Sequence, residues 1–159
     1  MALALLAYVG GALQQEGAGT TSVLERLAAQ SAIERAVGRV DQNLRIVIDP
    51  MIVHADEAPG GRDSTARSTA RNANLTQVFR ARSLPRRSVL DCSARPCSLR
   101  DADVLVTLSE PAIVGAKAKV TVTTLQRTSR GTQYRTVNVL LEHQGSAWKV
   151  VGFEDLGIS

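Results

Sequence analysis

Residues 103–155 read DVLVTLSEPAIVGAKAKVTVTTLQRTSRGTQYRTVNVLLEHQGSAWKVVGFED, and they hold nearly half of the β-branched residues of the chain and its one tryptophan. An apolar, β-branched segment, Asp103–Ser109, comes first. Apolar and polar residues alternate in the next two segments, Lys117–Leu125 and Gln133–His143, and the apolar segment Ala147–Phe153 ends the series. Alternation with a period of two places one set of side chains on each face of a half-buried strand. We therefore predict four consecutive antiparallel strands.

The connections between these segments support a meander. Ser129-Arg130-Gly131 and Gln144-Gly145-Ser146 are short, glycine-containing turns between apolar runs, which is typical of β-hairpins. Pro111 cannot donate a ladder hydrogen bond, so it marks a break or a sheet edge. A sheet of this kind has an apolar face that another layer must cover. The predicted fold class is α+β, with N-terminal helices packed on a curved antiparallel sheet.

The segments upstream supply the expected cover. Ser22 and Glu25 form the S-x-x-E pattern of a capping box and predict a helix from Ser22 to about Val40. Leu44–Ile48 predicts a short additional strand. Asp49-Pro50 closes it in one interpretation, and in the alternative Met51–His54 continues it beyond a kink. A second helix is expected to begin at Ser64 or Ser68 and to end near Arg80.

The first residues of the chain allow two interpretations. Met1–Leu13 is apolar over about a dozen residues, which is short for a membrane span. Gly10 and Ala12 suit signal-peptide cleavage after Ala12, although a basic leader is lacking. The first interpretation is an exported protein, periplasmic or secreted, with residues 1–19 as signal peptide and spacer and 20–159 as a single domain. The alternative is a buried N-terminal helix of a cytoplasmic protein.

Cys92 and Cys97 are the two cysteines of the chain. In an exported protein, two cysteines this close in sequence are expected to pair. Closing so short a loop removes little chain entropy, so we expect a small effect on stability. A metal site would need further Cys or His ligands nearby, and the sequence offers none there.

Positive charge is concentrated before the predicted sheet. Residues 58–100 contain nine arginines and two aspartates, and Arg80, Arg82, Arg86 and Arg87 form a predicted basic patch. Such a patch meets an anionic partner or a membrane surface, or it is simply solvated. Only 3% of the residues are aromatic, which argues against stacking on single-stranded nucleic acid. Any membrane contact is expected to be peripheral.

Four residues are candidates for acid–base chemistry: Asp49, His54, Asp103 and Tyr134. A carboxylate in a cavity between helices and sheet would have a raised pKa and could transfer protons. The sequence has no G-x-S-x-G element, no phosphate-binding glycine loop and no H-E-x-x-H motif, and we expect no cofactor. An enzyme hypothesis therefore requires at least two of the four candidates to converge on one cavity.

The order of elements resembles the NTF2-like superfamily, which includes the SnoaL-like and ketosteroid-isomerase-like proteins. Ala118–Leu125, Tyr134–Glu142 and the GSAWKVVG segment of residues 145–152 carry the resemblance. It implies a cone-shaped α+β domain, a fold that serves both enzymes and binding modules. Isomerases of this group use a carboxylate base with tyrosine or acid donors, and that set does not map onto this chain.

Two functional hypotheses follow. The first is a non-catalytic exported module that binds a small apolar ligand or a partner protein, including a second copy through the sheet. The alternative is a small NTF2-like enzyme that performs isomerase- or dehydratase-type proton transfer in the cone. The sequence favours the first, because it lacks a recognisable catalytic constellation.

Overall fold

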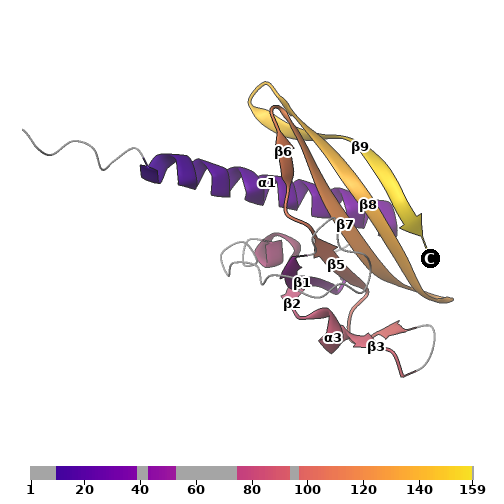
Figure 1. Cartoon of the computed structure of the whole chain (residues 1–159). Coiled ribbons are helices and arrows are strands. Elements are labelled where there is room, and N and C mark those ends of the chain that lie inside the picture. Colours follow the sequence, from indigo (N-terminus) through magenta and orange to yellow (C-terminus); the bar gives the residue numbers. More distant parts are fainter. Residues whose placement is uncertain (1–9, 39–42, 53–74, 94–96, 159) are drawn as a thin grey trace, which may run out of the picture.

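The computed structural model describes residues 10–38, 43–52, 75–93 and 97–158. One long helix, α1 (Gly10–Val37), lies across a large sheet, and its N-terminal end projects beyond the strands (Figure 1). A short helix, α3 (Arg86–Val89), precedes the strands of the C-terminal half. None of the described helices is long and apolar enough to cross a membrane.

The strands confirm the predicted meander. They are β1 (Ile46–Ile52), β2 (Arg82–Ser83), β3 (Leu90–Asp91), β4 (Ser98–Leu99), β5 (Val104–Leu108), β6 (Ala112–Val114), β7 (Lys117–Thr128), β8 (Gly131–Gln144) and β9 (Ala147–Ile158). The four predicted strands correspond to β5, β7, β8 and β9, and the last of these continues well beyond the predicted end at Phe153. The turns at residues 129–130 and 145–146 are hairpin turns, as expected.

The sheet is mixed rather than purely antiparallel. Its order is β2-β1-β5-β7-β8-β9, with β6 paired to β7. β1 runs parallel to both β2 and β5, whereas β5, β7, β8 and β9 pair antiparallel. The prediction of an antiparallel sheet is therefore wrong for β1. Asp49-Pro50 does not close that strand: β1 continues through these residues to Ile52, with a register irregularity between Ile48 and Ile52. This is the alternative expected from the sequence, confirmed as far as the described residues extend.

The helical layer differs most from the sequence prediction. α1 already begins at Gly10, so Ser22 and Glu25 lie inside the helix and do not form a capping box. Residues 14–20, expected to be a spacer, are helical. Gly38, with φ 84°, ends the helix, and its N–H donates to the Glu34 carbonyl at 2.7 Å. Of the second predicted helix, the described part is helical at 75–79, so α1 is the one long helix of the described residues.

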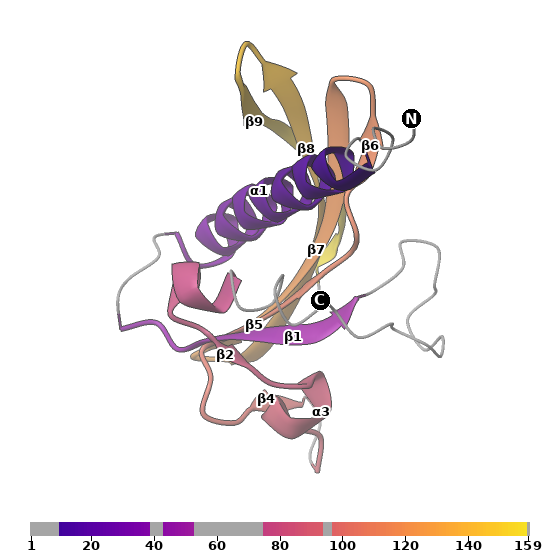
Figure 2. The same ribbon diagram turned by 90° about the vertical axis from the view of Figure 1, so that its left-hand side faces the viewer.

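Two cores stabilise the domain. The first core joins α1 to the sheet: Leu24, Ala28, Ala29, Ala32, Ile33, Ile46, Ile48, Leu75, Val104, Val106, Leu108, Ala118, Val120, Val122, Val137, Val139 and Leu141. The second core lies on the other face: Val47, Val89, Leu99, Ala102, Leu105 and Leu125. β5 contributes to both, and all its residues are buried, which explains why its sequence does not alternate. In Figure 2, α3 and β4 lie beyond β1 and β5, away from α1.

Arg80 ends the short helix at 75–79 in a left-handed conformation, with φ 49°. The N–H of Arg80 donates to Gln77 and the N–H of Ala81 donates to Thr76, which is the pattern of a Schellman motif. A residue with a Cβ atom is strained in this conformation by about 1 kcal/mol.

We expect Arg80→Gly to raise the free energy of unfolding by roughly 1 kcal/mol, because glycine adopts this backbone without strain. Urea denaturation measures the change, with Arg87→Gly, in the short α3, as the control. Destabilisation by Arg80→Gly would contradict the proposed strain.

Candidate functional site

The predicted acid–base candidates lie in three different surroundings. Asp49 is buried on β1, and its carboxylate accepts a hydrogen bond from the backbone N–H of Arg86 at 3.2 Å. Arg86 is the first residue of α3, so this carboxylate holds the start of that helix against β1. Asp49 thereby helps to position the segment that carries the second core.

Asp103 forms an ion pair at the entrance to β5. Its two carboxylate oxygens accept hydrogen bonds from Arg45 Nη2 at 2.9 Å and Nε at 3.1 Å, and from the Arg45 backbone N–H at 3.0 Å. The hydrogen bonds from the Arg45 side chain lower the pKa of Asp103 from 3.8 to about 2. A general base works best with a pKa near the working pH, so this carboxylate is poorly suited to proton transfer at neutral pH.

The Asp103–Arg45 pair predicts a pH-dependent stability. The folded-state pKa lies below the unfolded one, so the contribution is present above pH 3.8 and is lost as the pH falls through about 2. The side chains are 29% and 50% exposed, so water screens the pair, and we expect Asp103→Asn to cost about 1 kcal/mol at pH 7. Urea unfolding at pH 7 and pH 2 measures this. If the free energies of unfolding of wild type and Asp103→Asn differed equally at pH 7 and at pH 2, the predicted pH dependence would be contradicted.

Tyr134 packs at the margin of the second core on β8. The guanidinium carbon of Arg86 lies 5.9 Å from the centre of its ring, a cation–π contact. Strand pairing places Tyr134 opposite Leu125, Leu125 opposite Leu105, and Leu105 opposite Val47 of β1. Tyr134 is thus three strand spacings, about 14 Å, from β1.

The described candidates therefore do not converge. Asp49 and Tyr134 each contact a different part of Arg86, and Asp103 is engaged with Arg45. His54 lies outside the described residues. The other histidine, His143, is exposed beside the last hairpin, with its ring at 5.2 Å from that of Trp148 in an edge-on contact. The three described candidates, Asp49, Asp103 and Tyr134, therefore form no pair of cooperating groups among themselves.

The four arginines of the predicted basic patch are all exposed. Arg82 donates to the Asp101 carbonyl oxygen, and Arg86 lies over Tyr134. Among the described residues, Arg80 and Arg87 have no ion-pair partner. The sequence-based expectation of an electrostatic surface stays a prediction.

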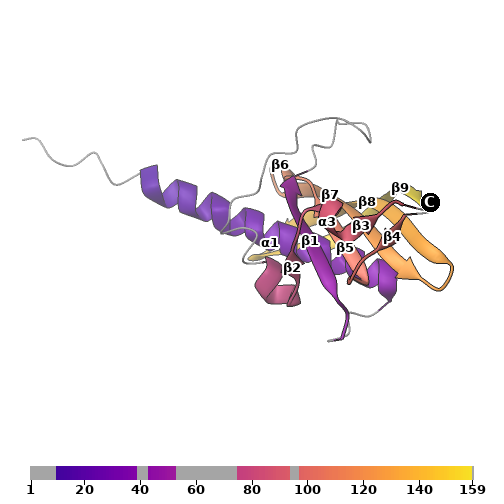
Figure 3. The same cartoon turned by 90° about the horizontal axis from the view of Figure 1, so that it is seen from below.

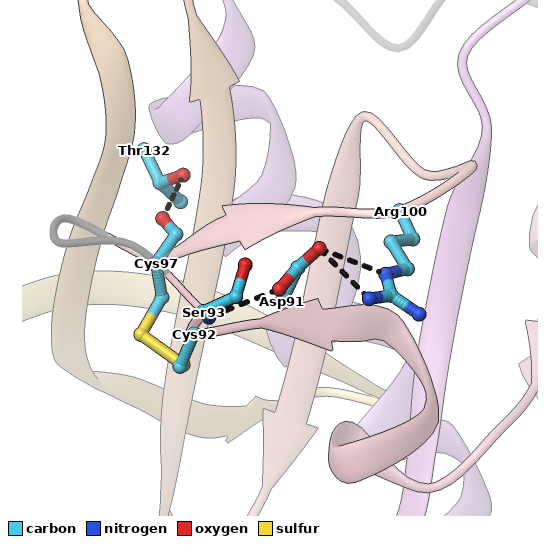
Figure 4. The surroundings of a disulfide bond; sticks show 6 residues. All are labelled: Asp91, Cys92, Ser93, Cys97, Arg100 and Thr132. Atoms are coloured by element: carbon cyan, nitrogen blue, oxygen red, sulfur yellow. Dashed lines mark hydrogen bonds and ion pairs between the residues drawn. A yellow bond between two sulfur atoms is a disulfide. The ribbon is translucent and has the colours of Figure 1, made fainter.

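Cys92 and Cys97 form the predicted disulfide, with an S–S distance of 2.06 Å. The bond closes the tip of the β3–β4 hairpin, as Figure 4 shows. In the same hairpin, the Asp91 carboxylate accepts hydrogen bonds from the Ser93 N–H at 3.0 Å and from Arg100 at 2.8 Å. These bonds, that of Ser93 first, lower the pKa of Asp91. Thr132 of β8 donates to the Cys97 carbonyl at 2.7 Å and so ties the hairpin to the main sheet.

We expect loss of the disulfide to be tolerated. The bond spans five sequence positions, and closing so short a loop contributes about 2 kcal/mol. The double variant Cys92→Ser/Cys97→Ser should therefore melt cooperatively at a modestly lower temperature. Its melting curve should not respond to a reductant, whereas that of the wild type should. Complete unfolding of the double variant would contradict this estimate.

A polar ladder crosses the face of the sheet opposite α1. Thr121 of β7 donates to Asn138 Oδ1 at 2.8 Å, and Asn138 Nδ2 of β8 donates to Glu154 Oε2 at 3.0 Å. Asn138 is buried, yet both ends of its amide are satisfied. The ladder therefore links β7, β8 and β9 on the face opposite α1, the face that also carries the second core.

The outer edge of β9 is a long exposed feature of the described part of the chain. β9 runs for 12 residues and ends the sheet, and no described strand pairs with its outer side (Figure 1). Val151, Leu156 and Ile158 are 52%, 57% and 55% exposed along it. An edge strand presents unpaired backbone N–H and C=O groups that a further strand can meet.

Ionic contacts hold β9 to α1. Asp155 pairs with Arg135 and Arg35, each at 2.9 Å, and the Arg35 guanidinium lies 4.8 Å from the centre of the Phe153 ring. These hydrogen bonds, that of Arg135 first, lower the pKa of Asp155. Figure 3 shows α1 passing beneath the strands while β9 remains at the margin of the sheet. The helix thus steadies the edge strand and leaves its outer side accessible.

Sequence reasoning missed two features of this arrangement. Glu25, interpreted as part of a helix start, is a fully buried carboxylate in the middle of α1. The extension of β9 through residues 154–158 was also missed, because that segment does not alternate. The apolar residues Leu156 and Ile158 were the available signal.

Comparisons with protein-family models, with curated proteins and with solved structures give no match to this chain.

Proposed function

We propose that this protein is a non-catalytic exported module that binds a partner polypeptide along the free edge of β9. One observation carries the proposal: a 12-residue edge strand with three large apolar side chains more than half exposed. Partner strands that add to such an edge gain affinity from main-chain hydrogen bonds and specificity from alternate side chains. Of the two binding roles expected from the sequence, a partner protein is the one that this edge favours.

Two features of β9 argue for controlled binding rather than indiscriminate aggregation. Lys149, Glu154 and Asp155 place charges along the strand, and charged side chains on an edge discourage non-specific pairing. The pairing with β8 is irregular between Thr136 and Val137 and between Leu140 and Leu141, which bends the edge locally. A partner must match both the charges and the bends.

Export and an NTF2-like architecture belong to the same proposal. The Cys92–Cys97 disulfide favours an oxidising compartment. The long helix against β7, β8 and β9, with Trp148 partly buried on the last strand, supports the NTF2-like resemblance. The parallel pairing of β1 would be this chain's variation on that cone.

Site-specific photo-cross-linking in the cells that produce the protein tests the proposal. A photoreactive phenylalanine replaces Val151 on the β9 edge or, as control, Val114 at the tip of β6. Val114 is 80% exposed and Val151 52%, so random collisions would label position 114 more strongly. We expect discrete protein adducts from position 151 and none from 114. Equal labelling, or no adduct from 151, would overturn the proposal.

A further inference from the structure

We infer that the strand that occupies the β9 edge is β9 of a second copy of this chain, paired antiparallel about a two-fold axis between Val151 and Gly152. The inference rests on the proposed function, since it names the partner for the same edge. The faces on which the β9 side chains lie, and the charges of these side chains, favour this register.

The pairing of β8 with β9 assigns each side chain to a face. Lys149 lies opposite Glu142, and Glu154 lies opposite Asn138. Asn138 belongs to the polar ladder, so Lys149 and Glu154 are on the polar face.

On the other face, Val150 lies opposite Leu141, and Phe153 lies opposite Val139. Leu141 and Val139 belong to the first core, and Val150 and Phe153 pack against it. These two side chains are therefore on the face that α1 covers.

Residues directly opposite each other in an antiparallel pair lie on the same face of a continuous sheet. A two-fold axis between Val151 and Gly152 places Lys149 opposite Glu154 of the second copy, on the polar face. It also places Val150 opposite Phe153 of the second copy, on the apolar face. Two-fold symmetry repeats both contacts, as in any isologous interface.

Neighbouring registers lose this match. Moving the axis onto Gly152 places Lys149 opposite Asp155, which lies on the α1 face with Arg35. A two-fold axis through Glu154 places Glu154 opposite Glu154 of the second copy, and like charges directly opposite each other are unfavourable. The charges that discourage non-specific pairing therefore favour one self-complementary register.

Sedimentation velocity of the purified full-length chain over a range of concentrations tests the inference. We expect a reversible monomer–dimer equilibrium. Lys149→Glu and Glu154→Lys should each raise the dissociation constant by about tenfold or more, because each creates two like-charge pairs. The double variant should restore the wild-type constant. Lys119→Glu, exposed on the polar face of β7 and away from the edge, should have no effect.

Two further measurements separate a weaker interface from a variant that folds poorly. Glu154→Gln keeps the oxygen that accepts from Asn138, so a weaker dimer here cannot come from loss of that hydrogen bond. Thermal melts confirm that every variant folds. The inference would be overturned if the wild type stayed monomeric. It would also be overturned if Lys149→Glu and Glu154→Lys left the dissociation constant of the dimer unchanged. A monomer whose position 151 still cross-links to another protein in cells would leave the proposed function standing.

Discussion

Leu24→Ala will lower the free energy of unfolding by about 2–5 kcal/mol, the usual cost of removing a buried leucine side chain. Leu24 is fully buried on α1, where the first core joins the helix to the sheet. The truncation leaves a cavity that Ala28 and Ala29 are too small to fill. Urea denaturation measures the loss.

The matched control for this experiment is Leu156→Ala. The same chemical change at a side chain that is 57% exposed should alter stability by about 0.5 kcal/mol or less. Equal effects at the two sites would mean that α1 does not form a layer of this domain.

Leu105→Ala will be similarly costly, at about 2–5 kcal/mol, but through the second core. Leu105 is buried on β5 against the cluster that includes Val89 and Leu99. Its loss should also expose the segment from α3 to β4, which hydrogen exchange of those amides detects.

The two truncations should add when combined. Leu24 and Leu105 belong to separate clusters on opposite faces of the sheet, and substitutions without shared partners are usually additive within about 0.5 kcal/mol. A large interaction energy in the double variant Leu24→Ala/Leu105→Ala would show that the molecule has a single, continuous core.

The sheet could be predicted well because its strands are amphipathic. In β7, Val120 and Val122 enter the first core while Thr121 and Thr123 face the polar side, and the sequence shows this alternation directly. The pairing of β1 with β5 could not be read in the same way. It joins residues that are 56 to 58 positions apart in the sequence, and strand periodicity contains no information on which strands become neighbours.

The helical layer was harder to predict for a physical reason. The glycine-containing, polar residues 14–20 and the Ser22–Glu25 pattern indicated a spacer followed by a helix start, yet α1 is continuous through them. Local propensity is a weak determinant that the rest of the fold can override. Burial of residues that pack on the sheet, such as Ala28 and Ile33, stabilises the helix by more than the glycines nearer its N-terminus destabilise it.

The candidate site was only partly accessible from the sequence. The Cys92–Cys97 bond followed from two closely spaced cysteines, and the structure confirms it. The contacts of Asp49 and Asp103 with Arg86 and Arg45 depend on tertiary geometry, as does the position of β9 at the edge. Each of these requires knowledge of which strand lies beside which.

Native mass spectrometry of the protein, purified gently from the cells that produce it, shows whether β9 carries a partner. We predict a stoichiometric protein complex, with twice the mass of the chain if the partner is a second copy. The same spectrum, after denaturation, should show a chain two daltons lighter than its reduced form, as the Cys92–Cys97 bond requires. A bare monomer at every concentration would contradict the claim that β9 binds a partner.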